Sequence, residues 1–192
     1  MAPSKPSSWP SNVQYIGAPR FHTTVSPAMR AFLTNGTNNT RKVPVSSHAG
    51  SCLVRIRYIS DPSHPARGQY GLFAAKKIPS QTHIIDYLGE VHCDQRNDSD
   101  YDLSLYRSQD GLNVGVDASV MGNESRFVND YRGIRGKPNA VFVDSRTPLG
   151  ELRMSVWSTG ETIKKGDEIL VSYGKSWWRA RTAENGDKVD QG

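Results

Sequence analysis

Cysteine is scarce in this sequence, with only Cys52 and Cys93 among its 192 residues. Two cysteines cannot build a disulfide scaffold or a cysteine-based zinc site, and they favour a reducing compartment. Long apolar runs are missing as well, so no segment offers the roughly 20 apolar residues that a membrane-spanning helix needs. The N-terminus lacks the apolar stretch of a secretory signal. The sequence therefore predicts a soluble protein with one ordinary domain and no membrane partner.

Negative charge is absent from the first part of the chain. No Asp or Glu precedes Asp61, whereas seven Lys and Arg residues do. Such a one-signed segment can make a weak contact with nucleic acid, because clustered cations release counterions from a polyanion. The same composition is also typical of a solvated flexible tail. A segment rich in Arg, Ser and Thr and free of acids further resembles an organelle transit peptide.

Residues 1–50 are dense in Ser, Thr, Pro and Asn, and we interpret them as a basic N-terminal extension. Within it Ser26 can cap a short helix that Pro27 opens and that continues through Leu33. Asn35 and the glycine after it would end this helix. Because residues 1 to about 20 show no buried pattern, we expect the fold to tolerate their deletion.

Short alternating or β-branched runs, separated by Gly, Pro and Asp, fill the rest of the chain. This pattern is typical of many small strands rather than of long helices. No internal repeat or heptad pattern is present, so the fold class is mainly β with few short helices. The predicted strands lie within residues 52–59, 71–78, 82–91, 101–107, 112–118, 139–145, 151–159 and 167–174.

Three blocks in order, "RGQYGLFAAKKIPSQTHIIDYLGE", "GNESRFVND" and "ETIKKGDEILVSYGKSWW", resemble the signature blocks of the SET domain. This family consists of protein lysine methyltransferases that use S-adenosylmethionine. The resemblance implies a SET-domain (β-clip) fold of small curved sheets in which the C-terminal segment threads under a loop as a pseudoknot, an exception to the usual absence of knots. It places the domain at residues 51–178, with a variable insert at about 91–116 and a tail at 179–192.

The resemblance also implies where the methyl donor binds. Arg126 and Asn129 would face its methionine part, whose ammonium and carboxylate need fixed partners in a partly dry pocket. Trp178 would stack on the adenine, although Trp177 and Trp178 could instead cap the lysine channel or anchor the tail. The implied cofactor-binding residues are Gly68, Gln69, Tyr70, Gly71, Arg126, Phe127, Asn129, Asp130 and Trp178.

Catalysis in this family needs a neutral lysine amine aligned with the methyl group. The resemblance makes Tyr173, in "VSYG", the catalytic tyrosine and Tyr87, in "YLGE", a second residue of the lysine channel. Their hydroxyls would orient the amine and organise water that removes its proton. No metal is required, and the product of the donor is S-adenosylhomocysteine.

The chain departs from the family in four respects. Its first block reads Gly-x-x-Gly where Gly-x-Gly is usual, and Asp130 stands where the family commonly has His. A carboxylate there would alter the electrostatics near the cofactor. The cysteine-rich zinc flanks are absent. Val171, two residues before the catalytic tyrosine, replaces an aromatic residue that controls the number of methyl groups, so that number is not predicted.

The expected function is that of an S-adenosylmethionine-dependent protein-lysine N-methyltransferase acting on a histone tail, a nucleosome or another basic protein in the nucleus. Cytoplasm or an organelle are alternative locations. An acidic run with Asp94, Asp98, Asp100 and Asp102 falls in the variable insert and would attract a basic peptide, or it is a solvated loop. The histidines, including His64, show no metal-ligand spacing and are interpreted as structural or solvent-exposed. The altered glycine block and Asp130 keep open a non-catalytic SET-like module that binds chromatin or peptides.

Overall fold

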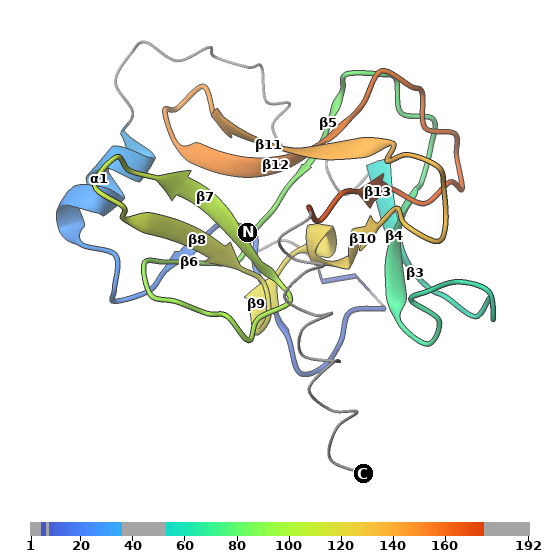
Figure 1. Ribbon diagram of the computed structural model, residues 1–192, viewed down its shortest axis with the longest axis horizontal. Coiled ribbons are helices and arrows are strands. Elements are labelled where there is room, and N and C mark those ends of the chain that lie inside the picture. The colour runs from blue at the N-terminus through green and yellow to red at the C-terminus, as the bar shows by residue number, and fades with distance from the viewer. Residues whose placement is uncertain (1–4, 7, 36–52, 175–192) are drawn as a thin grey trace, which may run out of the picture.

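The computed structural model describes residues 5–6, 8–35 and 53–174 (Figure 1). These residues form several small sheets, one short α-helix and one 3-10 helix, η1, so the predicted mainly β class is confirmed. None of the helices in the described part is long and apolar enough to cross a membrane. The elements are β1 (Gln14–Tyr15), β2 (Arg20–Phe21), α1 (Pro27–Thr34), β3 (Val54–Tyr58), β4 (Tyr70–Ala74), β5 (His83–Asp86), β6 (Glu90–His92), β7 (Asp102–Arg107), β8 (Asn113–Asp117), β9 (Met121–Gly122), η1 (Glu124–Phe127), β10 (Asn129–Asp130), β11 (Ala140–Arg146), β12 (Leu152–Ser158) and β13 (Leu170–Val171).

Three of the sheets are mostly antiparallel. β3 pairs with β4, β11 and β12 form a hairpin joined by β5, and β7, β8 and β6 form a sheet that β2 extends in parallel. The alternating burial of β3, with its two arginines outward, shows the period of two that predicted this strand. Two further pairs are short and parallel, β1 with β9 and β10 with β13. Parallel partners lie far apart in sequence, so these pairs tie distant segments together.

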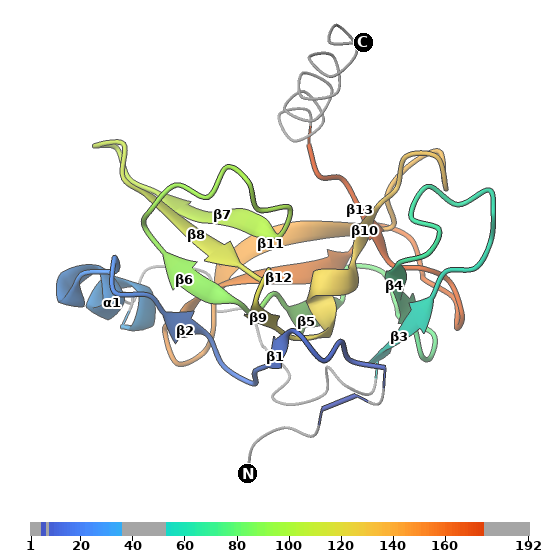
Figure 2. The same ribbon diagram turned by 90° about the horizontal axis from the view of Figure 1, so that it is seen from below.

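The helix α1 begins and ends where the sequence predicted. The hydroxyl of Ser26 accepts a hydrogen bond from the Met29 N–H at 3.2 Å, and Pro27 is the first helical residue. At the other end the Asn35 N–H donates to the Ala31 carbonyl at 2.8 Å. The helix lies at the end of the β2-β6-β8-β7 sheet (Figure 2), where it buries Leu33.

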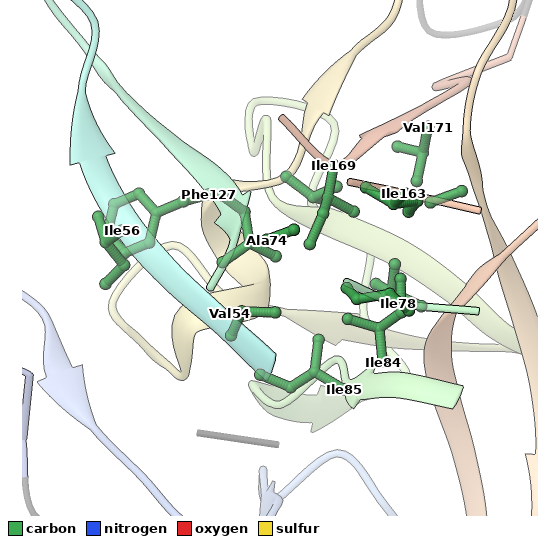
Figure 3. Close-up of a cluster of buried hydrophobic side chains, with 14 of the residues drawn as sticks. Val54, Ile56, Ala74, Ile78, Ile84, Ile85, Phe127, Ile163, Ile169 and Val171 are labelled. Atoms are coloured by element: carbon green, nitrogen blue, oxygen red, sulfur yellow. The ribbon is translucent and has the colours of Figure 1, made fainter. Parts of the chain in front are cut away.

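The main hydrophobic core lies where β3, β4 and β5 meet the segment that leads into β13 (Figure 3). Branched aliphatic side chains dominate it, as expected for a core assembled from strands. Its labelled members in the close-up are Val54, Ile56, Ala74, Ile78, Ile84, Ile85, Phe127, Ile163, Ile169 and Val171. Phe127 therefore belongs both to this core and to the block between β9 and β10.

The start of the chain packs against the same core, contrary to expectation. Trp9, Val13 and Ile16 are buried, and the Trp9 ring meets the Phe127 ring edge-on with 5.5 Å between centroids. The expectation that the first 20 residues lack a buried pattern is therefore wrong. These apolar residues are isolated among Ser, Pro and Asn, so no local periodicity marks them, and only long-range packing reveals their place. The boundaries of the domain and of the C-terminal tail stay predictions.

The strand β13 passes between two parts of one loop. On one side it pairs with β10, and the Tyr131 N–H donates to the Val171 carbonyl at 2.9 Å. On the other side Asn139 brackets Leu170, since its N–H donates to the Leu170 carbonyl at 3.1 Å and its side-chain oxygen accepts from the Leu170 N–H at 2.8 Å. The segment from β10 to Asn139 thus surrounds β13, as the resemblance implied, and Figure 1 shows β10 and β13 side by side.

Candidate functional site

Segments from all three sequence blocks line one open cavity of about 970 Å³. The fold brings these segments together in two ways. β10 pairs with β13, and η1 contacts the β3-β4 pair while Asn123, at its start, accepts a hydrogen bond from the Leu88 N–H next to Tyr87. Gly68 and Gly71 do not line this cavity, and Trp178 lies outside the described residues. The predicted site residues that do line it are Gln69, Tyr70, Tyr87, Arg126, Phe127, Asn129, Asp130 and Tyr173.

Tyr173 follows β13 and is held at both its backbone and its hydroxyl. Its N–H donates to Oδ2 of Asp130 at 2.8 Å, and its hydroxyl donates to the Val128 carbonyl at 2.8 Å. Burial, followed by the charge of Asp130, raises the pKa of the Tyr173 phenol above its ordinary value. The phenol is therefore neutral across the physiological range, and its oxygen can act towards the cavity as a hydrogen-bond acceptor.

Tyr87 lies in the turn between β5 and β6 with its hydroxyl similarly engaged. The hydroxyl donates to the Tyr101 carbonyl at 2.8 Å, and the ring meets the Phe142 ring edge-on at 5.8 Å. Burial raises the pKa of Tyr87 well above its ordinary value, with Tyr173 as the next cause. Tyr101 and Phe142 also line the cavity, so aromatic rings from several segments contribute to its wall.

Tyr101 and Phe142 were not predicted as site residues. Tyr101 lies in the acidic run of the insert, and Phe142 belongs to the ordinary strand β11. Neither position carries a local signal, because each ring reaches the cavity through the pairing of β7 with β8 and of β11 with β12. Pro65, Ala66 and Ile134 are further cavity residues that the sequence did not indicate.

Arg126 is buried, and its guanidinium faces aromatic rings and backbone carbonyls. Its Nε donates to the Ala118 carbonyl at 2.9 Å, and its Nη2 makes a longer contact with the Ser119 carbonyl at 3.4 Å. The guanidinium lies over the Tyr101 ring at 4.2 Å. Such a cation–π contact stabilises a desolvated arginine. Arg126 therefore connects the η1 block to the aromatic wall, and its predicted role towards the cofactor stays a prediction.

The two positions Gly68 and Gly71 of the first block require glycine for different reasons. Gly68 has a φ of +84°, a left-handed turn conformation that favours glycine. Gly71 lies in β4, and a Cβ there would come within 2.6 Å of Oε1 of Glu168. The structure thus explains Gly71 by the space that the Glu168 carboxylate occupies, and contact of either glycine with a cofactor stays a prediction.

Asp130 is buried and accepts hydrogen bonds from several donors. The Arg132 N–H donates to Oδ1 at 2.9 Å, Nη1 of Arg132 donates to Oδ2 at 2.8 Å, and the Tyr173 N–H donates to the same Oδ2. The ion pair with Arg132 offsets the negative charge that was expected to disturb the cofactor site. Asp130 therefore connects β10 to the segment that follows β13, at the candidate catalytic residue Tyr173.

The acidic residues of the insert serve different purposes. Desolvation acts to raise the pKa of Asp94, but hydrogen bonds, first from Arg96, outweigh it and lower that pKa to about 2. Arg96 also bonds to Glu90 at 2.8 Å and to Asp117 at 3.1 Å, so Asp94 is part of a structural network. Asp100 and Asp102 instead line the cavity. In the described part of the chain no group of three or more His, Cys, Asp or Glu residues could hold a metal ion.

Comparison with known proteins finds relatives among the histone-lysine N-methyltransferases. Histone-lysine N-methyltransferase EHMT1 of Mus musculus is 30% identical over 113 residues, which cover 57% of this chain and 8% of that protein. Putative histone-lysine N-methyltransferase ASHH4 of Arabidopsis thaliana is 29% identical over 111 residues, covering 54% of this chain and 30% of that protein. The chain therefore spans less than a third of the length of these curated relatives.

A solved structure of the Chaetomium thermophilum Polycomb Repressive Complex 2 aligns with a TM-score of 0.49 and 23% identity over 69% of this chain and 17% of that chain. The family model described as SET domain matches residues 69–174. This match covers more than half of the chain and contains the cavity-lining parts of β4, η1, β10 and the Tyr173 segment. The protein belongs to the SET-domain family and is related to histone-lysine N-methyltransferases.

Proposed function

We propose that the protein is an S-adenosylmethionine-dependent protein-lysine N-methyltransferase. The observation that carries the proposal is the cavity in which Tyr173, Tyr87 and Asn129 converge from three separate segments. Its volume of about 970 Å³ lies within the roughly 300–1,000 Å³ of ligand pockets. Aromatic faces suit the adenine and the sulfonium, while the Asn129 side chain offers a polar contact for the amino-acid end. The residues present therefore fit the donor.

The donor, when bound, supplies an electrophilic methyl group. The chain's own task is to present a neutral amine to it. Aromatic walls formed by Tyr87, Tyr101 and Phe142 desolvate a lysine side chain that enters the cavity, and desolvation lowers the pKa of its amine. As the amine becomes desolvated on entering the cavity, it loses its proton to water.

The two tyrosine hydroxyls orient the amine by accepting hydrogen bonds. The Tyr173 hydroxyl donates a hydrogen bond to the Val128 carbonyl, and the Tyr87 hydroxyl donates one to the Tyr101 carbonyl. Each hydroxyl oxygen therefore remains available to accept a hydrogen bond from an amine N–H. With both N–H groups held, the lone pair of the nitrogen is directed at the methyl group. Neither phenol acts as the base, because burial raises both pKa values.

The substrate proposed is a histone tail or another basic protein in the nucleus. Two kinds of support exist. The relatives reported above are named histone-lysine methyltransferases, and Asp100 and Asp102 at the cavity would attract a positively charged peptide. A weak nucleic-acid contact by the basic N-terminal extension stays a prediction, as do the cofactor roles of Gly68, Gln69, Gly71 and Trp178.

Methyl transfer from labelled S-adenosylmethionine to a histone panel and a whole-cell extract, followed by peptide mapping, tests activity and substrate together.

We expect Tyr173→Phe to keep donor affinity within a few-fold and to lower the single-turnover rate by roughly 10²–10⁴. Tyr58→Phe, on a ring that is 58% exposed, is the matched control and should leave both unchanged. The wild-type rate should rise from about pH 7 towards 9, because free lysine titrates near 10.4.

Three outcomes bear directly on the assignment. Asn129→Ala should weaken donor binding by about 2–4 kcal/mol, since it removes a partner of a charged group. Full activity of Tyr173→Phe would remove this residue from the mechanism. Donor binding without transfer to any substrate would favour a non-catalytic module that binds chromatin or peptides.

A further inference from the structure

A buried carboxylate lies directly behind the cavity residue Asn129. Oε1 of Glu168 accepts a hydrogen bond from Nδ2 of Asn129 at 2.8 Å, and Oε2 lies 2.9 Å from Nε2 of His64. The side chains of His64 and Glu168 are only 10% and 7% exposed. Burying a carboxylate is costly unless its oxygens are hydrogen-bonded, and here each oxygen has one partner.

The backbone fixes the tautomer of His64. Its Nδ1 accepts a hydrogen bond from the Ala66 N–H at 3.0 Å, so in the neutral ring the proton is on Nε2 and is donated to Glu168. Pro65 and Ala66, the next two residues, line the cavity. His64 thus connects the loop between β3 and β4 to Glu168, which lies two residues before β13.

The chain keeps space for this carboxylate. Gly71 of β4 faces it, and any Cβ at that position would lie 2.6 Å from Oε1 of Glu168. A larger residue at position 71 would displace the acceptor on which Asn129 depends. Gly71 and His64 therefore both keep the Glu168 carboxylate in the position where it accepts the hydrogen bond from Asn129.

The carboxylate determines which way the Asn129 amide faces. Both nearby protein atoms are acceptors, Oε1 of Glu168 at 2.8 Å and the Tyr70 carbonyl oxygen at 3.5 Å, so the nitrogen must face them. The side-chain oxygen has no hydrogen-bond partner within the described residues, and Asn129 lines the cavity. The group that Asn129 offers to a ligand is therefore a carbonyl acceptor.

We propose that Glu168, held by His64, is a positioning residue that fixes Asn129 with its carbonyl oxygen available to the cavity. In this orientation Asn129 recognises a hydrogen-bond donor, and the α-ammonium of S-adenosylmethionine or S-adenosylhomocysteine is that donor. The inference rests on the proposed function, because it concerns the cavity assigned to the methyl donor. It adds a recognition device for the amino group that lies outside the cavity lining itself.

Glu168→Gln tests the device with almost no change of shape. Glutamine has one acceptor and one donor end, whereas both neighbours, His64 and Asn129, present N–H groups. One of them must lose its partner, and an amide N–H directed at Asn129 favours the reversed orientation of Asn129. The protein should then bind the ligand's amino group less tightly, while its other contacts with the ligand stay unchanged.

The measurement is calorimetric affinity for S-adenosylhomocysteine and for its analogue without the α-amino group. In the wild type the desamino analogue should have the larger dissociation constant. We expect the ratio of its dissociation constant to that of S-adenosylhomocysteine to fall about tenfold or more in Glu168→Gln, which corresponds to the loss of one hydrogen bond to a charged group. Affinity for the desamino analogue should stay within about twofold. Glu161→Gln is the matched control, because that carboxylate is 40% exposed and pairs with Lys137 on the surface.

His64→Gln provides a second, independent variant. It removes the imidazole that anchors Glu168 and should shrink the same ratio by about threefold or more, even if Glu168→Gln fails to fold. Equal weakening of both ligands, or an unchanged ratio in the folded variants, would overturn the positioning role while leaving the proposed function intact. Wild-type protein that binds neither ligand would overturn both.

Discussion

Substituting Trp9 should destabilise the whole domain, because this residue closes the main core from outside the SET blocks. Its ring is 6% exposed and packs edge-on against Phe127 at 5.5 Å and Tyr15 at 4.9 Å. Its Nε1 donates to the Val13 carbonyl at 2.6 Å. Removal of a buried aromatic ring costs about 3–5 kcal/mol, a large share of the roughly 5–15 kcal/mol that holds a domain folded.

Urea denaturation followed by circular dichroism measures this loss. We expect Trp9→Ala to lower the free energy of unfolding by about 3–5 kcal/mol, and Trp9→Phe, which keeps a ring but loses the indole N–H, by about 1–2 kcal/mol. Leu149→Ala is the control, since Leu149 is 86% exposed and should change stability by less than about 0.5 kcal/mol. Because Phe127 lines the cavity, donor affinity should fall with Trp9→Ala. A stability within about 1 kcal/mol of wild type would refute the reasoning that the N-terminal segment is part of the folded unit.

Two further predictions concern the backbone and the response to acid. Gly89→Ala should destabilise the protein by at least about 3 kcal/mol or prevent folding, because a Cβ there would overlap a backbone carbonyl oxygen at the end of β8, whereas Gly136→Ala, with open space around it, should be tolerated. Thermal unfolding of both variants checks this, and equal melting temperatures would contradict it. Burial acts to raise the pKa of Asp86, but hydrogen bonds from His83 and Ser155 outweigh it and lower that pKa. The contribution of Asp86 to stability is therefore complete above the unfolded pKa of about 3.9 and is lost as pH falls further. Asp86→Asn should therefore make the urea midpoint depend less on pH between about pH 5 and 2. A pH dependence equal to that of the wild type would refute this prediction.

Local patterns predicted most of the fold. Alternation identified β3 and the strands that follow it, and the Ser26–Pro27 pair located the start of α1. The strands β1, β2 and β9 have only two residues each, too short for any periodicity, and they depend on parallel partners far along the chain. Trp9 was missed for the same reason, since its burial arises from contact with Phe127 rather than from its neighbours in sequence.

The candidate site shows a similar division. Residues inside recognisable blocks, such as Asn129 and Tyr173, could be named because the blocks have a fixed order. Tyr101 and Phe142 reach the cavity only through strand pairing. Glu168 lies at the start of the strand predicted within residues 167–174, and the sequence gives no sign that Gly71 leaves room for its carboxylate.

The knot explains how Tyr173, the proposed catalytic residue, can tolerate Asp130 where the family commonly has His. Methyl transfer requires the amine and the methyl group to be aligned, and a displacement of about 1 Å is costly to the rate. Asp130 belongs to β10 and accepts the N–H of Tyr173 beyond β13, so one carboxylate fixes the tyrosine relative to the strand that carries Asn129. Its charge is balanced by Arg132 only two residues away, and this ion pair offsets part of the cost of burying the carboxylate. Asp130 therefore supplies a backbone anchor for Tyr173, at the point where the proposed donor and lysine sides of the cavity meet, and it is compatible with the proposed activity.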